Sequence, residues 1–140
     1  MAEAFAGIVC GYALALLYTP IGTLALVRAR VNSPAVARLM PQGTSLVALS
    51  IILHTFAFFA FTAVGMIFGI ILNGLESSSP AGGLGSPNRV FSALVLATVA
   101  IAVLPLAIAV ARWRVGLTAS GLLFAGVFGW AMPYLALLGD

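Results

Sequence analysis

The sequence predicts an all-α integral membrane protein, a bundle of four transmembrane helices with both termini on the non-cytoplasmic side. Of its 140 residues, 63% are hydrophobic and only 6% are charged, against roughly a quarter charged in soluble domains. Four apolar segments each reach the length of about 20 residues that a bilayer crossing needs. Every Arg, Asp and Glu lies outside these segments, so the surroundings of the helices are expected to be lipid.

The expected spans are 4–27, 44–75, 90–111 and 116–138, forming one domain over 1–140. The first follows Glu3 rather than a basic stretch, which favours a retained membrane helix over a cleaved signal peptide. The second is longer than a bilayer crossing needs, so it is expected to tilt or to extend past the surface. Cys10 is the only cysteine, which excludes an internal disulfide, and no metal site is expected.

The basic residues set the orientation. Five of the six lie between the first and second spans or between the third and fourth, and these are Arg28, Arg30, Arg38, Arg112 and Arg114. Basic loops stay on the cytoplasmic side, so a multi-pass protein of the cell membrane is predicted. The net charge of +3 comes from these loops and does not indicate nucleic-acid binding.

The first basic connector, "SPAVARLMP", allows two interpretations. It forms a short amphipathic helix on the inner surface, capped by Ser33 with Pro34 in the first position and stopped by Pro41 and Gly43, or it forms a simple loop. The connector between the second and third spans, "ESSSPAGGLGSPNR", is expected to be flexible because it is rich in Ser, Gly and Pro.

The first and third spans show a weak internal repeat. A phenylalanine, a proline and an arginine recur with spacings that agree to within one residue: Phe5, Pro20 and Arg28, then Phe91, Pro105 and Arg112. Either the chain is a duplicated hairpin, or the pattern follows from the positive-inside rule and the frequency of proline in membrane helices.

Three prolines lie inside the spans, at positions 20, 105 and 133. Each removes one backbone N–H, so the carbonyls of Leu16, Ile101 and Gly129 lose their usual donors. These positions are either tolerated kinks or local polar sites.

Two G-x-x-x-G motifs predict close helix packing, one at Gly7 and Gly11 and the other at Gly65 and Gly69. Small residues let membrane helices approach closely. Both motifs fall in the outer half of the predicted bundle, so they either face each other or form an interface with a second copy.

The only histidine, His54, lies inside the second span. If the glycine faces meet, the helical period brings His54 beside Tyr18 and Gly22, with the Tyr18 hydroxyl as its candidate partner and Thr19 nearby. His54, Tyr18 and Thr19 therefore form the candidate intramembrane site.

Four roles compete for His54, because an ionisable group inside a membrane is a functional hypothesis by default. It is a neutral hydrogen-bonding group between helices, a carrier of protons or ions, an axial ligand to haem or a chlorophyll-type pigment, or a catalytic residue. Catalysis is the weakest of the four, since no carboxylate or second histidine lies in any span and only Ser50 is near along the helix.

The leading functional prediction is an accessory or structural subunit of a larger membrane complex, with respiratory and photosynthetic assemblies as candidate classes. Its expected partners are the lipid bilayer and other membrane subunits or copies of itself. The alternative is a small homo-oligomeric transporter or channel with its pathway near His54, which the repeat and the prolines favour. A membrane enzyme is the third class, and the sequence shows no acid or base beside the clustered arginines that would support it.

Overall fold

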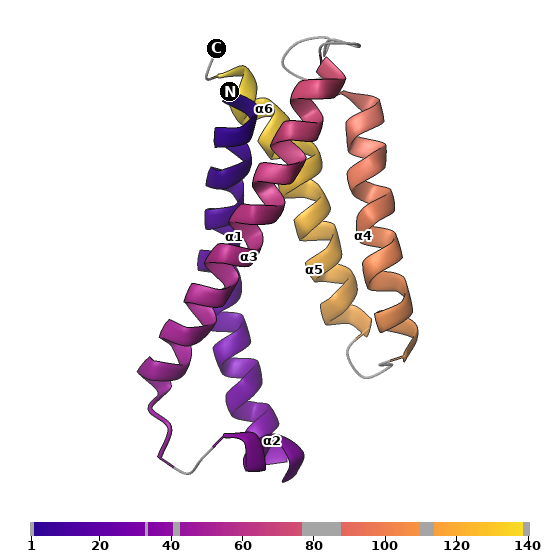
Figure 1. Cartoon of the computed structure of the whole chain (residues 1–140). Coiled ribbons are helices and arrows are strands. Elements are labelled where there is room, and N and C mark those ends of the chain that lie inside the picture. The colour runs from indigo at the N-terminus through magenta and orange to yellow at the C-terminus, as the bar shows by residue number, and fades with distance from the viewer. Residues whose placement is uncertain (1, 33, 41–42, 77–87, 110–113, 139–140) are drawn as a thin grey trace.

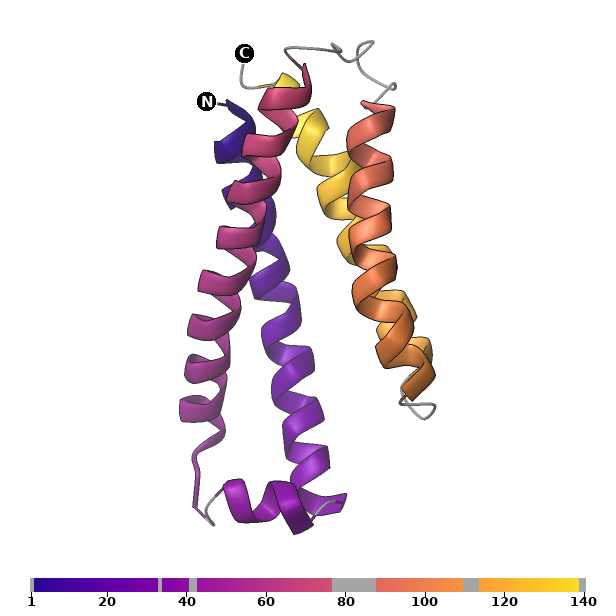
Figure 2. The same cartoon turned by 45° about the vertical axis from the view of Figure 1, so that its right-hand side comes forward.

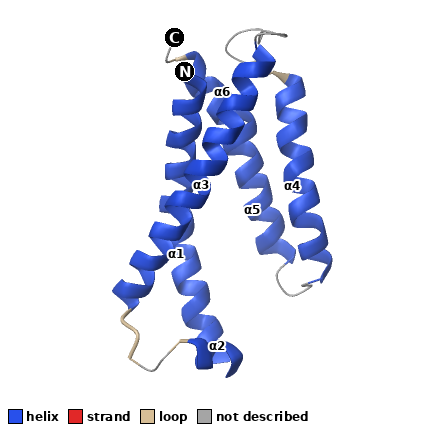
Figure 3. Cartoon of the chain, viewed as in Figure 1, coloured by secondary structure: helices blue, strands red, loops and turns tan. Residues whose placement is uncertain are grey.

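The computed structural model describes residues 2–32, 34–40, 43–76, 88–109 and 114–138, and within these ranges the chain is helical with no strand (Figure 3). The elements are α1 (Ala2–Asn32), α2 (Pro34–Leu39), α3 (Leu46–Glu76), α4 (Arg89–Ala109), α5 (Arg114–Gly126), a π-helical turn (Val127–Ala131) and α6 (Met132–Leu137). Within the described residues, four helical segments are long and apolar enough to cross a membrane: α1, α3, α4 and the continuous α5–α6 stretch. The prediction of an all-α chain with four such helices is confirmed.

The helices form two antiparallel pairs, α1 with α3 and α4 with α5–α6 (Figure 1). The start of α1 and the end of α6 lie at one end of the bundle, and α2 lies at the other. With 31 residues each, α1 and α3 are about 46 Å long, whereas the 21 residues of α4 span about 31 Å. The first pair therefore extends past the second at the α2 end (Figure 2).

Helix α1 is longer than its apolar segment. It continues to Asn32, so Arg28 and Arg30 lie in its last turns. The prediction that these two residues belong to a loop is wrong. Cations near a helix C-terminus are favoured by the helix dipole, and Arg is a good helix former.

The short connector helix forms as α2, followed by Gly43 with φ +104°. Ser33, Pro41 and Arg112 lie outside the described residues.

A π-helical turn directly precedes α6, in which Pro133 is the second residue. Proline has no backbone N–H, so it leaves a carbonyl of the preceding turn without its usual donor. The Ser92 hydroxyl of α4 donates a hydrogen bond of 2.9 Å to the carbonyl of Gly129. This bond joins α4 to the turn that precedes Pro133, while α1 and α4 pass through their own prolines without interruption.

The buried core lies toward the end of the bundle that holds the start of α1 and the end of α6. Phenylalanine rings from three helices meet there, with centroid distances of 5.5 Å between Phe68 and Phe128 and 6.2 Å between Phe68 and Phe91. Tight van der Waals packing of this kind associates helices in lipid, where the hydrophobic effect between them is weak. The buried members of this core are Ala6, Cys10, Leu14, Phe68, Leu72, Phe91, Val95, Phe128, Met132 and Ala136.

Candidate intramembrane polar site

The two G-x-x-x-G motifs face each other within the chain, at the crossing of α1 and α3. A Cβ atom on Gly7 would overlap the carbonyl group of Gly65, 2.6 Å from its carbon, and one on Gly69 would lie 2.6 Å from the Cα of Ala4. On Gly11 the Cβ would lie 2.6 Å from the carbonyl carbon of Phe61. The helix backbones are in direct contact here, so these glycine faces serve the α1–α3 interface.

Below this crossing, toward α2, His54 of α3 meets Thr19 of α1. The Thr19 Oγ1 lies 3.0 Å from the His54 Nδ1 and 2.7 Å from the carbonyl oxygen of Ala15. A hydroxyl carries one proton, and Thr19 donates it to Ala15. The Nδ1–H of His54 is therefore the donor to Thr19, which leaves the Nε2 of a neutral imidazole with a lone pair.

The expected pairing of His54 with Tyr18 is wrong. The Tyr18 hydroxyl donates a 3.0 Å hydrogen bond to the carbonyl oxygen of Ser120 in α5, and Gly22 faces the Leu53 side chain. Successive residues point about 100° apart around a helix. Thr19 therefore bonds to α3 and the Tyr18 hydroxyl bonds to α5, while the Tyr18 ring contacts Phe61 of α3 at a centroid distance of 5.3 Å.

Tyr12 also belongs to the site, although it was not among the residues predicted from the sequence. Its ring contacts the His54 ring edge-on, with centroids 6.4 Å apart at 73°, and also contacts the Phe58 ring. Tyr12 and Thr19 are seven residues apart, two helical turns, and so share a face. This spacing could have predicted the contact from the sequence. Position 12 lies on the same face of α1 as Thr19, so a long side chain there reaches toward the residue of α3 that bonds to Thr19.

Two polar groups of the site have no hydrogen-bond partner within the part of the chain that the structure describes. These are the Nε2 of His54 and the hydroxyl of Tyr12, a residue that is 43% exposed. The unprotonated nitrogen of a neutral imidazole accepts a hydrogen bond or ligates a metal, and a phenol hydroxyl both donates and accepts hydrogen bonds. The site can therefore bind a neighbouring polar group; no cluster of three or more His, Cys, Asp or Glu occurs among the described residues.

The basic residues gather at the α2 end. Arg28 and Arg30 end α1, Arg38 lies in the last turn of α2, and Arg114 begins α5. Figure 1 places these segments at the end of the bundle opposite to the start of α1. Arg89, at the first position of α4, lies at the other end.

Comparisons with known proteins give no family for this chain. No family model, no curated protein and no solved structure matches it. Inference about function therefore rests on the helices and on the polar groups that they position.

Proposed function

We propose that the chain is a multi-pass membrane protein whose α2 end is cytoplasmic, and that it acts as a non-catalytic subunit of a larger membrane complex. The orientation is supported by the distribution of Arg28, Arg30, Arg38 and Arg114 at the α2 end, since cytoplasmic ends carry the excess of Arg. An antiparallel four-helix arrangement then places both chain ends outside.

The observation that carries the subunit assignment is the pair of unsatisfied groups on α1 and α3. Tyr12 lies about 15 Å along α1 from its first residue, which is near the middle of a hydrocarbon layer about 30 Å thick. Tyrosines that serve as membrane anchors lie at the interfaces instead. A hydroxyl and an imidazole nitrogen without partners cost free energy in lipid, so a second polypeptide that bonds to Tyr12 and His54 would stabilise both.

Other hydroxyl side chains of the four long helices support this assignment over the transporter alternative. Thr55 and Thr98 each donate to the carbonyl one turn earlier, Tyr18 joins α1 to α5, and Ser92 joins α4 to the π-helical turn. A permeation pathway needs polar groups that remain available along one continuous line. These hydroxyls are engaged in holding the helices, as expected of a structural element.

The experiment that tests the proposal compares two positions on the lipid-facing surface. A photo-crosslinking amino acid replaces either Tyr12 or Ile101, which is 76% exposed on α4, and the protein is irradiated in its native membrane. We expect a defined protein adduct from position 12 and only lipid adducts from position 101. The mass of the complex in mild detergent should fall in the Tyr12→Phe, His54→Ala double variant.

The alternatives have their own readouts on the same sample. A colourless particle of one chain, with lipid adducts from both positions, refutes the subunit proposal. A homo-oligomer whose solute flux in vesicles changes in His54→Ala favours the transporter. The lone pair on the His54 Nε2 also suits an axial ligand, so visible absorbance that His54→Ala abolishes would identify a haem or chlorophyll-type pigment.

A further inference from the structure

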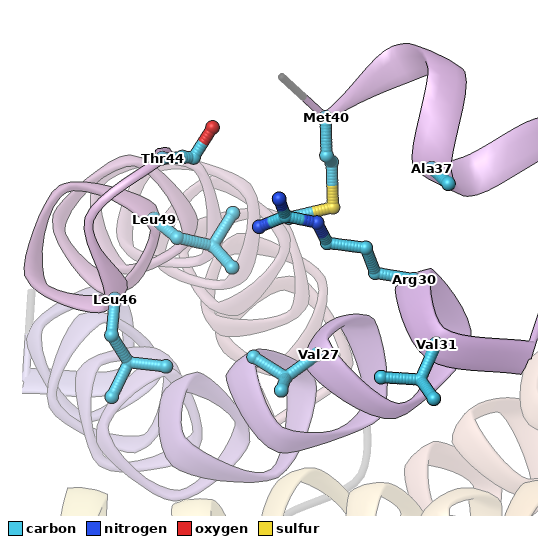
Figure 4. A pocket seen from close by; sticks show the side chains of 8 residues that line it. All are labelled: Val27, Arg30, Val31, Ala37, Met40, Thr44, Leu46 and Leu49. Carbon is cyan, nitrogen blue, oxygen red and sulfur yellow. The ribbon is translucent and has the colours of Figure 1, made fainter. Parts of the chain in front are cut away.

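A pocket of about 560 Å³ opens at the α2 end, between the last turns of α1, the short helix α2 and the start of α3 (Figure 4). Its volume falls in the range of about 300–1,000 Å³ that is usual for ligand sites. Its lining includes Val27 and Arg30 of α1 and Leu46 and Leu49 of α3.

The pocket follows from the way α1 and α3 cross. Their backbones touch where Gly7 meets Gly65, and the helices separate toward α2, which bridges the two ends (Figures 1 and 2). Gly43, with its positive φ, lies in the link from α2 to α3, a conformation that other residues rarely adopt. The pocket lies in the space that opens between α1 and α3 as they separate from the glycine contact.

The chemistry of the pocket combines apolar walls with one cation. Val27, Leu46 and Leu49 provide hydrocarbon surface, and the guanidinium of Arg30 extends across the space toward α3 (Figure 4). Arg30 forms no hydrogen bond or ion pair with the described part of the chain. The acidic residue Glu3 lies at the opposite end of α1, so it does not compensate this charge.

We propose that this pocket binds one anionic phospholipid from the leaflet at the α2 end. The phosphate accepts hydrogen bonds from the Arg30 guanidinium, whose planar fork matches two phosphate oxygens, and an acyl chain lies along Val27 and Leu49. A phospholipid matches both the cation and the apolar walls of the pocket. Free phosphate would match only the cation. The inference rests on the proposed membrane insertion but not on the proposed contact at Tyr12 and His54.

The neighbouring arginine provides the matched control. Arg28 lies in the same turn of α1, carries the same charge and does not line the pocket. Protein purified in mild detergent with equal amounts of phosphatidylglycerol and phosphatidylcholine is analysed by native mass spectrometry. We expect wild-type protein to retain one phosphatidylglycerol, Arg30→Gln to reduce that retention about fivefold or more, and Arg28→Gln to change it by less than about twofold.

Equal losses in the two variants would overturn the proposal, because they would show general attraction of anionic lipid to a basic end. Equal retention of phosphatidylcholine by wild-type protein would overturn it too.

A second pair of variants tests the apolar walls without changing charge. Leu49→Trp fills the pocket, whereas Ile52→Trp enlarges a side chain that is 66% exposed on the outer surface of α3. We expect Leu49→Trp alone to lower phosphatidylglycerol retention, and millimolar inorganic phosphate not to displace the lipid. Unchanged retention in Leu49→Trp, or displacement by inorganic phosphate, would refute a lipid site. The transporter and subunit readouts above are independent of these results.

Discussion

Replacement of Gly65 by alanine is the sharpest test of the α1–α3 crossing. A Cβ atom at position 65 would overlap the Gly7 carbonyl group, 2.7 Å from its carbon, and would lie 3.0 Å from the Cε1 of Phe128. Carbon atoms in ordinary contact are about 3.5–4.0 Å apart, so the helices must separate by roughly 1 Å. Overpacking of this kind costs about 1–3 kcal/mol. The Thr19–His54 bond, 3.0 Å long, crosses the same interface and should weaken.

The lone cysteine reports this change directly. Cys10 is 3% exposed in the core, so a maleimide dye labels its thiol only when the helices separate. In a thermal ramp in mild detergent, Gly65→Ala should lower the labelling midpoint by roughly 4–12 °C. Gly74→Ala is the matched control on the same helix, because a Cβ at position 74 meets nothing within 4 Å. If both variants show the wild-type labelling midpoint, the contact between Gly7 and Gly65 does not stabilise the packing of α1 against α3.

Three further predictions use the same labelling assay. In a double-mutant cycle, Thr19→Val and His54→Ala should be less than additive, with a coupling of about 0.6–1.7 kcal/mol; full additivity would mean that the two groups do not bond. Tyr18→Phe removes the hydroxyl that joins α1 to α5 and should lower stability by about 0.5–1.5 kcal/mol, and an unchanged midpoint would argue against that link. Ser92→Ala should destabilise the protein less in a Pro133→Ala background, since alanine restores a backbone N–H near the carbonyl that Ser92 serves; equal losses in both backgrounds would contradict this account.

The proposed subunit role and the proposed lipid site make different demands on the molecule. Tyr12 is the eleventh residue of α1 and His54 the ninth residue of α3, and under the proposed insertion their polar groups would bind a partner inside the hydrocarbon layer. Arg30 lies near a helix end, where a headgroup can reach it. Tyr12→Phe and Arg30→Gln should leave the glycine crossing intact, so an unchanged Cys10 labelling midpoint shows that these variants have a binding defect and not a folding defect. His54→Ala also removes the bond to Thr19, so its midpoint is expected to fall.

The sequence by itself determined the helices and the polar groups that needed explanation. Hydropathy over about 20 residues is a local property, so the four apolar segments were readable without a structure. The glycine motifs at Gly7 and Gly65 were equally visible, because small residues at a four-residue spacing lie on one helix face. The isolation of His54 within an apolar segment identified it as a residue in need of a partner.

Only the tertiary structure decided which side chain became that partner. Tyr18 and Thr19 are adjacent in sequence but point about 100° apart, and the direction in which α1 crosses α3 turned Thr19 toward His54. The bond from Ser92 to Gly129 and the pocket around Arg30 join segments far apart in the chain. Such contacts depend on crossing angles and on the position of α2, which arise from the packing of whole helices and which no local pattern of residues encodes.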